Sequence, residues 1–194
     1  HIVLKEENLI AHKVKFINLV VNGNDLGVYI LIEQISKELI EKNKRREGPV
    51  IGFDKELWIE EVNNIDNLGI NDIHQFFWTA KIKPTRFKKS QQGTIQEIYL
   101  NKAINLLEAF RKKELKANKV FDIEQLSKLM AIKAIFASLD FDWKDIKFYY
   151  NPITELLEPV SREVHSMHHY HAKLSLWAFN AEPHIFPWHK QFLD

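Results

Sequence analysis

Four acidic residues near the C-terminal third of the chain have the types and order that phosphate chemistry requires. Asp140, Asp142 and Asp145 lie within the segment SLDFDWKD, residues 138–145, and Glu163 follows about twenty positions later. Transfer of a phosphoryl group needs one carboxylate that orients and deprotonates the attacking hydroxyl, and it needs oxygen ligands for a divalent cation on the phosphates. These acids are therefore candidates for both tasks, although the spacing alone is also compatible with solvated acids in turns.

The positions of these acids relative to an expected β-hairpin sharpen the hypothesis. Asp140 and Asp145 are five positions apart, which is the separation of Asp and Asn in the catalytic loop of protein kinases. In kinases a hairpin and then a metal-binding acid follow that loop, and here residues 147–160 have the pattern of a hairpin. The hairpin would place the acids on opposite sides of a nucleotide.

The elements that must hold these acids follow from hydrophobic periodicity and turn signals. Strands are expected at Val14–Val21 and from Gly27 to Ile32, joined by the turn formers NGND, and the order of elements predicts an α+β fold rather than a doubly wound parallel sheet. Residues 63–89 are expected to form a loop-rich insertion. Further along, the expected elements are a helix from Gln34 to about Lys44, a strand over Pro49–Phe53, a helix from the N-cap Ser90 through Phe110, a helix from the N-cap Asp122 to about Ser138, and strands over Lys147–Tyr150 and Leu156–Val160.

Length and composition limit the classes of protein that the chain can form. With 194 residues, 45% of them hydrophobic, and a net charge of +1, we expect one globular domain over residues 1–194. No apolar run is long enough for a transmembrane segment. The near-neutral charge argues against nucleic acid as a partner, and the lack of cysteine excludes disulfides. Because the chain starts at His1 with no signal peptide, we expect a piece truncated at both ends, and its localisation stays unknown.

Three stretches of sequence resemble the CotH kinase family, the spore-coat protein H-like proteins. They are VVNGNDLGVYILIE (20–33), RREGP (45–49), and FYYNPIT (148–154) with LEPV (157–160). Their order matches the family pattern of an "NG…GvY…E" hairpin followed by "D…N…fYynP.tg.lePi..D". The resemblance covers about residues 14–163. It implies an atypical protein-kinase-like fold that uses ATP and Mg²⁺ or Mn²⁺ to phosphorylate Ser/Thr of a protein substrate, on a spore coat or a bacterial cell surface.

The resemblance also implies a role for individual residues. Asp140 takes the position of the catalytic aspartate, with Asp142 as a competitor, and Asp145 and Glu163 take the positions of the metal ligands. Three further residues are candidates for nucleotide binding: Glu33 as the partner of a nucleotide-binding lysine, Arg46 (or Arg45) as a phosphate contact, and Lys55 as the nearest substitute for a basic residue that relatives often place near Gly52.

The chain departs from the family pattern at three of these positions. Asp145 replaces an Asn, Glu163 replaces an Asp, and Gly52 stands where a basic residue is common. Both acids can still supply oxygen ligands to a metal ion, but the longer side chain of Glu163 would shift the position of that ion. The alternative to a kinase is therefore a catalytically degenerate CotH-like module that binds a partner protein.

Other polar clusters have local explanations. His165, His168, His169 and His171 could bind a transition metal on a structural domain or respond to pH, but we interpret them first as a polar segment, at the surface or partly buried, beside the active-site cleft. The basic runs 42–46 and 111–113 are expected at solvated helix ends, and the run 81–89 could hold an acidic protein substrate. Of the neighbours Tyr149 and Tyr150, alternation predicts one in the core and the other in a cleft or in solvent.

Overall fold

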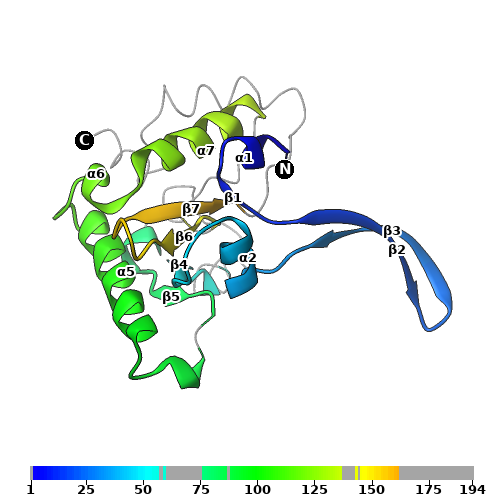
Figure 1. Ribbon diagram of the computed structural model, residues 1–194, viewed down its shortest axis with the longest axis horizontal. Helices are drawn as coiled ribbons and strands as arrows, with labels where there is room; N and C mark the ends of the chain where they lie inside the picture. Colours follow the sequence, from blue (N-terminus) through cyan, green and yellow to red (C-terminus); the bar gives the residue numbers. More distant parts are fainter. Residues whose placement is uncertain are drawn as a thin grey trace.

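The protein is an α+β structure in which helices cover a mixed β-sheet, and a long β-hairpin projects from this body (Figure 1). The computed structural model describes residues 2–56, 59, 76–86, 88–136, 143 and 145–161, with the backbone alone at Lys89. The described elements are α1 (Ile2–Glu6), β1 (Ile10–Ala11), β2 (Val14–Val21), β3 (Asn24–Ile32), α2 (Lys37–Lys42), β4 (Val50–Phe53), β5 (Ile82–Pro84), the 3₁₀ helix η1 (Lys89–Gln91), α5 (Ile95–Arg111), α6 (Ala117–Val120), α7 (Ile123–Ile135), β6 (Lys147–Tyr150) and β7 (Leu157–Ser161).

Five of the strands form one sheet in the order β1-β7-β6-β4-β5. The pairs β4–β5, β4–β6 and β6–β7 are antiparallel, whereas the short β1 runs parallel to β7 with Ile10 opposite Val160. The hairpin predicted over residues 147–160 is therefore confirmed as β6–β7. The predominance of antiparallel pairs also confirms that this sheet is not a doubly wound parallel one.

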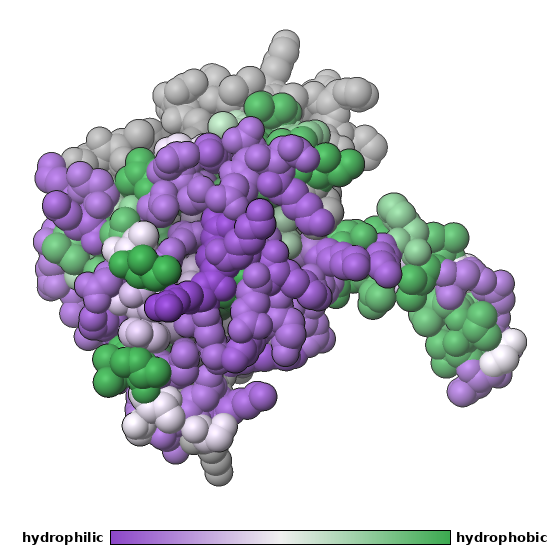
Figure 2. Space-filling view, viewed as in Figure 1, coloured by the Kyte–Doolittle hydropathy of each residue, from purple (hydrophilic) through white to green (hydrophobic). Residues whose placement is uncertain are grey.

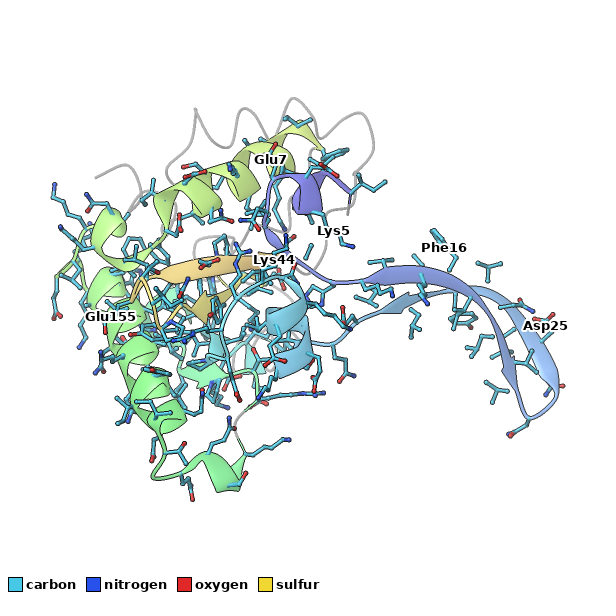
Figure 3. All side chains as sticks on the ribbon, viewed as in Figure 1. Lys5, Glu7, Phe16, Asp25, Lys44 and Glu155 are labelled. Atoms are coloured by element: carbon cyan, nitrogen blue, oxygen red, sulfur yellow. The ribbon has the colours of Figure 1, made fainter. Side chains whose placement is uncertain are left out.

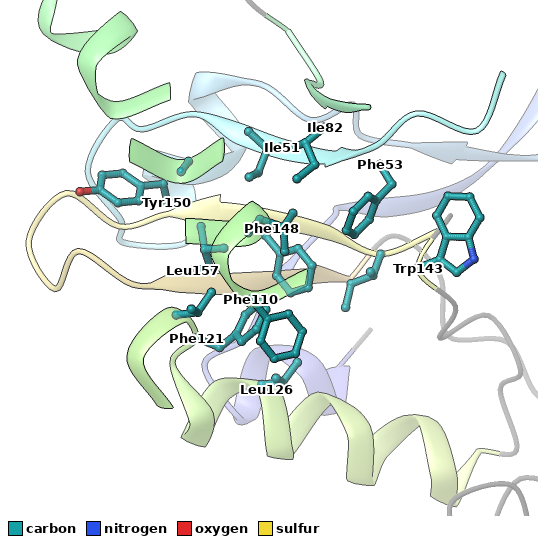
Figure 4. Packing of buried hydrophobic residues seen from close by; sticks show 14 of the residues in the cluster. Ile51, Phe53, Ile82, Phe110, Phe121, Leu126, Trp143, Phe148, Tyr150 and Leu157 are labelled. Atoms are coloured by element: carbon teal, nitrogen blue, oxygen red, sulfur yellow. The ribbon is translucent and has the colours of Figure 1, made fainter. Parts of the chain in front are cut away.

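Both faces of the sheet are covered. The larger core joins one face to α5 and α7, and Figure 4 shows Phe148 and Leu157 of the sheet against Phe110, Phe121 and Leu126. On the other face, a smaller cluster joins the sheet to Ile40 of α2. Tyr150 belongs to the first cluster and Tyr149 to the second, and both are 0% exposed. Neither tyrosine is exposed to solvent, because helices cover both faces. Tyr150 also borders a cavity between α5 and the β6–β7 turn, so the expectation that one of the two lines a cleft is met by Tyr150.

The helix starts follow from capping side chains. α7 begins after Asp122 as predicted, since the carboxylate of Asp122 accepts a hydrogen bond from the Gln125 amide at 3.1 Å. The predicted N-cap Ser90 is wrong, because it lies in η1 and the N-cap of α5 is Thr94, whose hydroxyl accepts from the Gln96 amide at 3.2 Å. Ser90 and Thr94 are both residue types that cap helices, and the chain turns at Gly93 (φ 71°) between them.

Two basic segments differ from the sequence expectation. Arg111, expected at a solvated helix end, is 9% exposed and donates hydrogen bonds to the carbonyls of Phe77 (3.0 Å) and Ala80 (2.5 Å). It satisfies the carbonyls of residues 77 and 80 under α5. Ile82–Pro84, expected within the loop-rich insertion, form the edge strand β5. The residue types near Arg111 do not indicate that it is buried. The proline at the end of Ile82–Pro84 argues against a strand, although an edge strand tolerates it.

The hairpin β2–β3 confirms the predicted strand pair and its turn. Asn22 (φ 52°) and Gly23 (φ 83°) form a two-residue loop with both φ angles positive, the geometry that favours Asn-Gly. The register shifts between Asn18 and Val20, where Asp25 accepts hydrogen bonds from the Gly27 amide at 2.8 Å and from Asn18 at 3.2 Å. Local turn chemistry therefore sets the shape of the hairpin.

The hairpin is apolar on both faces and has no layer of described residues over either. Phe16 is 75%, Val28 74% and Ile30 58% exposed. Figure 2 shows apolar residues along much of the arm with hydrophilic residues at its tip, and Figure 3 shows Phe16 and Asp25 at a distance from the body. Among the described helices, none has the length and apolar character that a bilayer span requires.

Candidate functional site

A lysine and an aspartate that the sequence singled out meet at one end of the sheet. Because β4 and β6 are antiparallel, the residues that follow β4 and those that precede β6 leave the sheet at the same end. Lys55 follows β4 and Asp145 precedes β6, and Lys55 Nζ lies 3.4 Å from Asp145 Oδ1. Their side chains are 43% and 31% exposed. The proposed nucleotide-binding lysine and the proposed metal ligand are therefore partners that solvent can reach.

Trp143 anchors the segment that carries Asp145. Its indole is 0% exposed and packs edge-on against Phe53, the last residue of β4, with ring centroids 5.9 Å apart. Phe77 lies beside both rings, and Ile146 on the other side of Asp145 is 4% exposed. Figure 4 shows Phe53 and Trp143 together at one end of the sheet, opposite Tyr150. This packing fixes the backbone on both sides of Asp145 while leaving its carboxylate accessible.

Lys147 is a residue of this site that the sequence analysis missed. Its partner across the strands is Gly52, and its side chain occupies the space above that glycine: a Cβ built on Gly52 would lie 2.4 Å from Lys147 Cδ and 2.7 Å from Lys147 Nζ. The ammonium also lies 3.4 Å from the carbonyl oxygen of Phe53. The signal that could have found it is the strand register, which sequence periodicity does not supply.

Charged side chains of both signs lie near Gly52. Asp54 accepts hydrogen bonds from Lys83 Nζ and from the Glu56 amide, and these bonds hold the pKa of the Asp54 carboxyl below its ordinary value against the opposing effect of burial. The same bond to Asp54 raises the pKa of Lys83. The charge of Lys147 also contributes to the lowered pKa of Asp54. The carboxylate of Asp54 and the ammonium group of Lys83 therefore stay charged at neutral pH.

Lys83 also borders a cavity with a basic lining at the edge of the sheet. The cavity has a volume of about 610 Å³ and is lined by Lys83, Pro84, Thr85, Arg86 and Lys88. Arg86 donates a hydrogen bond to the side-chain carbonyl of Gln34. The run 81–89, expected as a possible holder of an acidic substrate, thus forms a basic wall along the edge of the sheet. The wall leads from Lys83 opposite Gly52 past Thr85 beside Val50, toward the end of the sheet opposite Lys55 and Asp145.

Glu33 is placed at the base of the projecting hairpin and is not joined to Lys55. Its carboxylate pairs with Lys42 of α2 at 2.7 Å and accepts from the Lys13 amide at 3.1 Å. The bond to Lys42 lowers the pKa of Glu33. Within the described residues, no hydrogen bond or ion pair connects Glu33 to Lys55, so Glu33 fastens β2 and β3 to α2 in this structure.

The two arginines 45 and 46 have different surroundings. Arg45 is a structural residue: its side chain is 9% exposed, donates to Glu158 Oε2 at 2.9 Å, and contacts Asn8 Oδ1 at 2.8 Å. Arg46 is exposed, and its backbone carbonyl accepts a hydrogen bond from the Tyr149 hydroxyl at 2.6 Å. Neither arginine is hydrogen-bonded to Lys55 or Asp145. The proposed phosphate contact of Arg46 stays a prediction, whereas Arg45 is already engaged.

The remaining predicted site residues lie outside the described part of the chain. These are Asp140, Asp142 and Glu163, together with the histidines at 165–171. Within the described part, no group of three His, Asp or Glu side chains is arranged to hold a metal ion. Asp145 is therefore the predicted metal ligand whose surroundings the structure defines.

The chain matches a known protein family. The family model described as CotH kinase protein matches residues 3–173 of the 194. The match includes the hairpin β2–β3, the end of the sheet with Lys55 and Asp145, and the positions of Asp140, Asp142 and Glu163. A search of the curated proteins found no match.

Proposed function

The chain belongs to the CotH kinase family, and on this premise we propose that it transfers the γ-phosphoryl group of ATP to a Ser or Thr hydroxyl of a protein, with Mg²⁺ or Mn²⁺. The observation that supports this proposal is the approach of Lys55 Nζ to Asp145 Oδ1, 3.4 Å apart and accessible to solvent. A kinase needs a positively charged side chain that binds the phosphates, close to a carboxylate that binds the metal ion. Lys55 and Asp145 at this end of the sheet are of these two types.

The pair can open for a nucleotide at little cost. A separation of 3.4 Å between partly exposed charges is worth at most about 1 kcal/mol. In the proposed complex, Lys55 moves to phosphate oxygens, and Asp145 contributes its carboxylate to the cation. Protein sites for Mg²⁺ commonly supply one or two carboxylates, while water and phosphates supply the other ligands. One defined carboxylate beside Lys55 fits that requirement, and the cation supplies charge neutralisation on the phosphates when bound.

The reaction itself follows from the family roles of the acids. Asp140 orients the acceptor hydroxyl and takes its proton as the hydroxyl oxygen forms a bond to the γ-phosphorus. The bond from the γ-phosphorus to the bridging oxygen breaks, and ADP leaves with that electron pair. The rate enhancement comes from holding the two reactants in line and from stabilising the charge on the transferred group.

The basic cavity along the edge strand β5 supports a protein substrate with acidic residues. Between positions 73 and 96 the chain has Lys81, Lys83, Arg86, Lys88 and Lys89 and no acidic residue. An acidic segment of the substrate that extends from the phosphorylated hydroxyl along the edge of the sheet would be attracted to this wall.

The test is transfer of radiolabel from γ-labelled ATP to casein and to the chain itself. Asp140→Asn should lower the rate by at least about 100-fold, the usual effect of removing a general base, without changing the melting temperature. Asp145→Ala should also be inactive, whereas Asp145→Asn keeps an oxygen ligand and should retain activity. The matched control Asp25→Asn changes an acid on the hairpin and should be fully active. An Asp140→Asn variant with normal activity would contradict the proposal.

The projecting hairpin favours a second candidate function. Its exposed side chains, among them Phe16, Val28 and Ile30, form the kind of apolar surface that marks protein interaction sites. The second candidate is a module of the same family that binds a partner protein without catalysis. Two results together would favour this module over the kinase. The chain would bind no ATP, and Phe16→Ser would abolish its binding to a partner protein.

A further inference from the structure

The projecting hairpin has an open strand edge along β2. The strands β2 and β3 form a sheet of their own, so among the described strands β2 has one neighbour and its outer edge has none (Figure 1). A two-stranded hairpin is marginally stable in water by itself, and this one exposes Phe16, Val28 and Ile30. An open edge that carries apolar side chains is a template on which a further strand can pair.

The register shows which backbone groups of β2 face this open edge. The Glu33 amide donates a hydrogen bond to the carbonyl of Lys13, so these two residues form a hydrogen-bonded pair. In an antiparallel ladder such pairs alternate with pairs that are not hydrogen-bonded, and the register is regular from Val14 to Asn18. The amides and carbonyls of Val14, Phe16 and Asn18 therefore point outward, to the open edge.

The outer edge of β3 is less suited to pairing. Near the tip, Gly27 has a φ of 82° and its amide donates to the Asp25 carboxylate at 2.8 Å, so the strand is irregular there. Near the base, Glu33 pairs with Lys42 of α2. An antiparallel strand centred on the regular part of β3, residues 28–32, would carry its own tip past the base of the hairpin toward α2.

We propose that β2 pairs antiparallel with β2 of a second copy of the chain, so that the two hairpins form one four-stranded sheet across a twofold axis. The contact is isologous and stops at two copies, because each β2 occupies the open edge of the other. With Ile17 on the axis, Phe16 lies opposite Asn18 of the second copy, and the outward groups of both strands meet. The dimer requires neither ATP nor catalysis, so it is independent of the proposed function.

The charges of the hairpin support a second copy in this alignment. Lys15 is the one charged residue of β2. A parallel pairing in register would set the two Lys15 side chains side by side, which is unfavourable. The antiparallel pairing sets each Lys15 opposite Leu19 of the second copy, toward the hairpin tip, where Asp25 is the charged residue. Like charges are thus kept apart, and the positive base of one hairpin lies near the negative tip of the other.

The size of the contact predicts a reversible dimer. Pairing of two short strands belongs with the small interfaces, which bury less than about 1,200 Å² in total, and we expect a dissociation constant in the micromolar range. In sedimentation equilibrium, the mass should rise from one to two copies between about 1 and 100 µM chain. Phe16→Pro removes an outward amide and no bond to β3, so it should stay monomeric. The control Phe16→Val keeps the amide and should still dimerise.

Cysteine cross-linking tests the alignment, because the chain has no cysteine of its own. Ile17→Cys places two thiols directly opposite each other on the axis, with Cα atoms about 4.5 Å apart, which suits a disulfide. An added oxidant should convert most of this variant to a covalent dimer. The matched control is Tyr29→Cys, at the cross-strand partner of Ile17 on β3. Its two thiols would lie three strand spacings apart, about 14 Å, and should not cross-link.

Each result decides for or against the proposal. A mass of one copy at 100 µM would refute the dimer, and binding of some other protein by that monomer would assign the hairpin to a different partner. A dimer that persists in Phe16→Pro would refute pairing through β2. Equal cross-linking of Tyr29→Cys and Ile17→Cys would show another packing of the hairpins and would also refute the proposal. Selective cross-linking of Ile17→Cys, with a monomeric Phe16→Pro, would support it.

Discussion

Replacement of Gly48 by Ala is expected to destabilise the fold strongly, because β6 leaves no room for a methyl group there. A Cβ on Gly48 would lie 2.4 Å from the carbonyl oxygen of Tyr150, 2.9 Å from Tyr149 Cε2 and 3.4 Å from Pro152 Cδ. The first of these atoms is backbone in a central strand, so relief requires the strand to move. That movement breaks the bond from the Tyr150 amide to the Pro49 carbonyl, 2.9 Å long.

The cost follows from two terms. Overpacking of a close-packed interior costs about 1–3 kcal/mol, and the lost hydrogen bond costs about 0.5–1.5 kcal/mol. We therefore expect the free energy of unfolding to fall by about 1.5–4.5 kcal/mol, which for a chain of this size corresponds to a drop in melting temperature of roughly 3–18 °C.

Gly52→Ala is the matched control in the same region. Its methyl group would meet only the flexible side chain of Lys147, which can rotate away, so the change in stability should stay within about 1 kcal/mol. Urea unfolding followed by tryptophan fluorescence measures both variants. The explanation from backbone contact would be refuted if Gly48→Ala were no less stable than Gly52→Ala.

Two further predictions concern ion pairs. Arg45→Met leaves the buried Glu158 without its positively charged partner, with the hydrogen bond from Asn151 remaining, and should cost about 3–5 kcal/mol. Arg46→Met, whose contact is through the backbone, should change stability by no more than about 0.5 kcal/mol. Equal effects in urea unfolding would contradict the division between the two arginines. Glu33→Gln should lower stability at neutral pH by less than about 1 kcal/mol. Because the bond to Lys42 lowers the folded-state pKa of Glu33, its contribution is complete above the ordinary pKa of a glutamate and disappears as pH falls through the lowered value. Melting curves of the variant and the wild type should therefore converge in acid, and a difference that grows in acid would show the wrong sign.

Much of the fold could be predicted because local signals decide it. The Asn22-Gly23 turn with its flanking β-branched residues, and the N-cap Asp122, are confirmed by the structure. Local signals were not enough where tertiary contacts decide. Arg111 is charged at a helix end but buried under carbonyls, and Tyr150 is buried because α5 covers its face of the sheet.

The site could be predicted only in part for the same reason. Lys55 and Asp145 were found from sequence, and the antiparallel pairing of β4 with β6 brings them together. Lys147 was missed, because its place above Gly52 depends on strand register, which a pattern of residue types does not contain. Glu33 was predicted to pair with a nucleotide-binding lysine, whereas in the structure it pairs with Lys42 of α2. The sequence does not show which lysine the fold brings to Glu33.

The most direct test of a nucleotide site at this end of the sheet is a thermal-shift titration with ATP and Mg²⁺, on the wild type and on Asp145→Ala. A ligand at 100 times its dissociation constant stabilises a protein by about 2.7 kcal/mol, which gives a clear rise in melting temperature. We predict a rise that requires the metal and is lost in Asp145→Ala. The absence of any rise at millimolar ATP with Mg²⁺ or Mn²⁺, or an equal rise in the variant, would contradict the site.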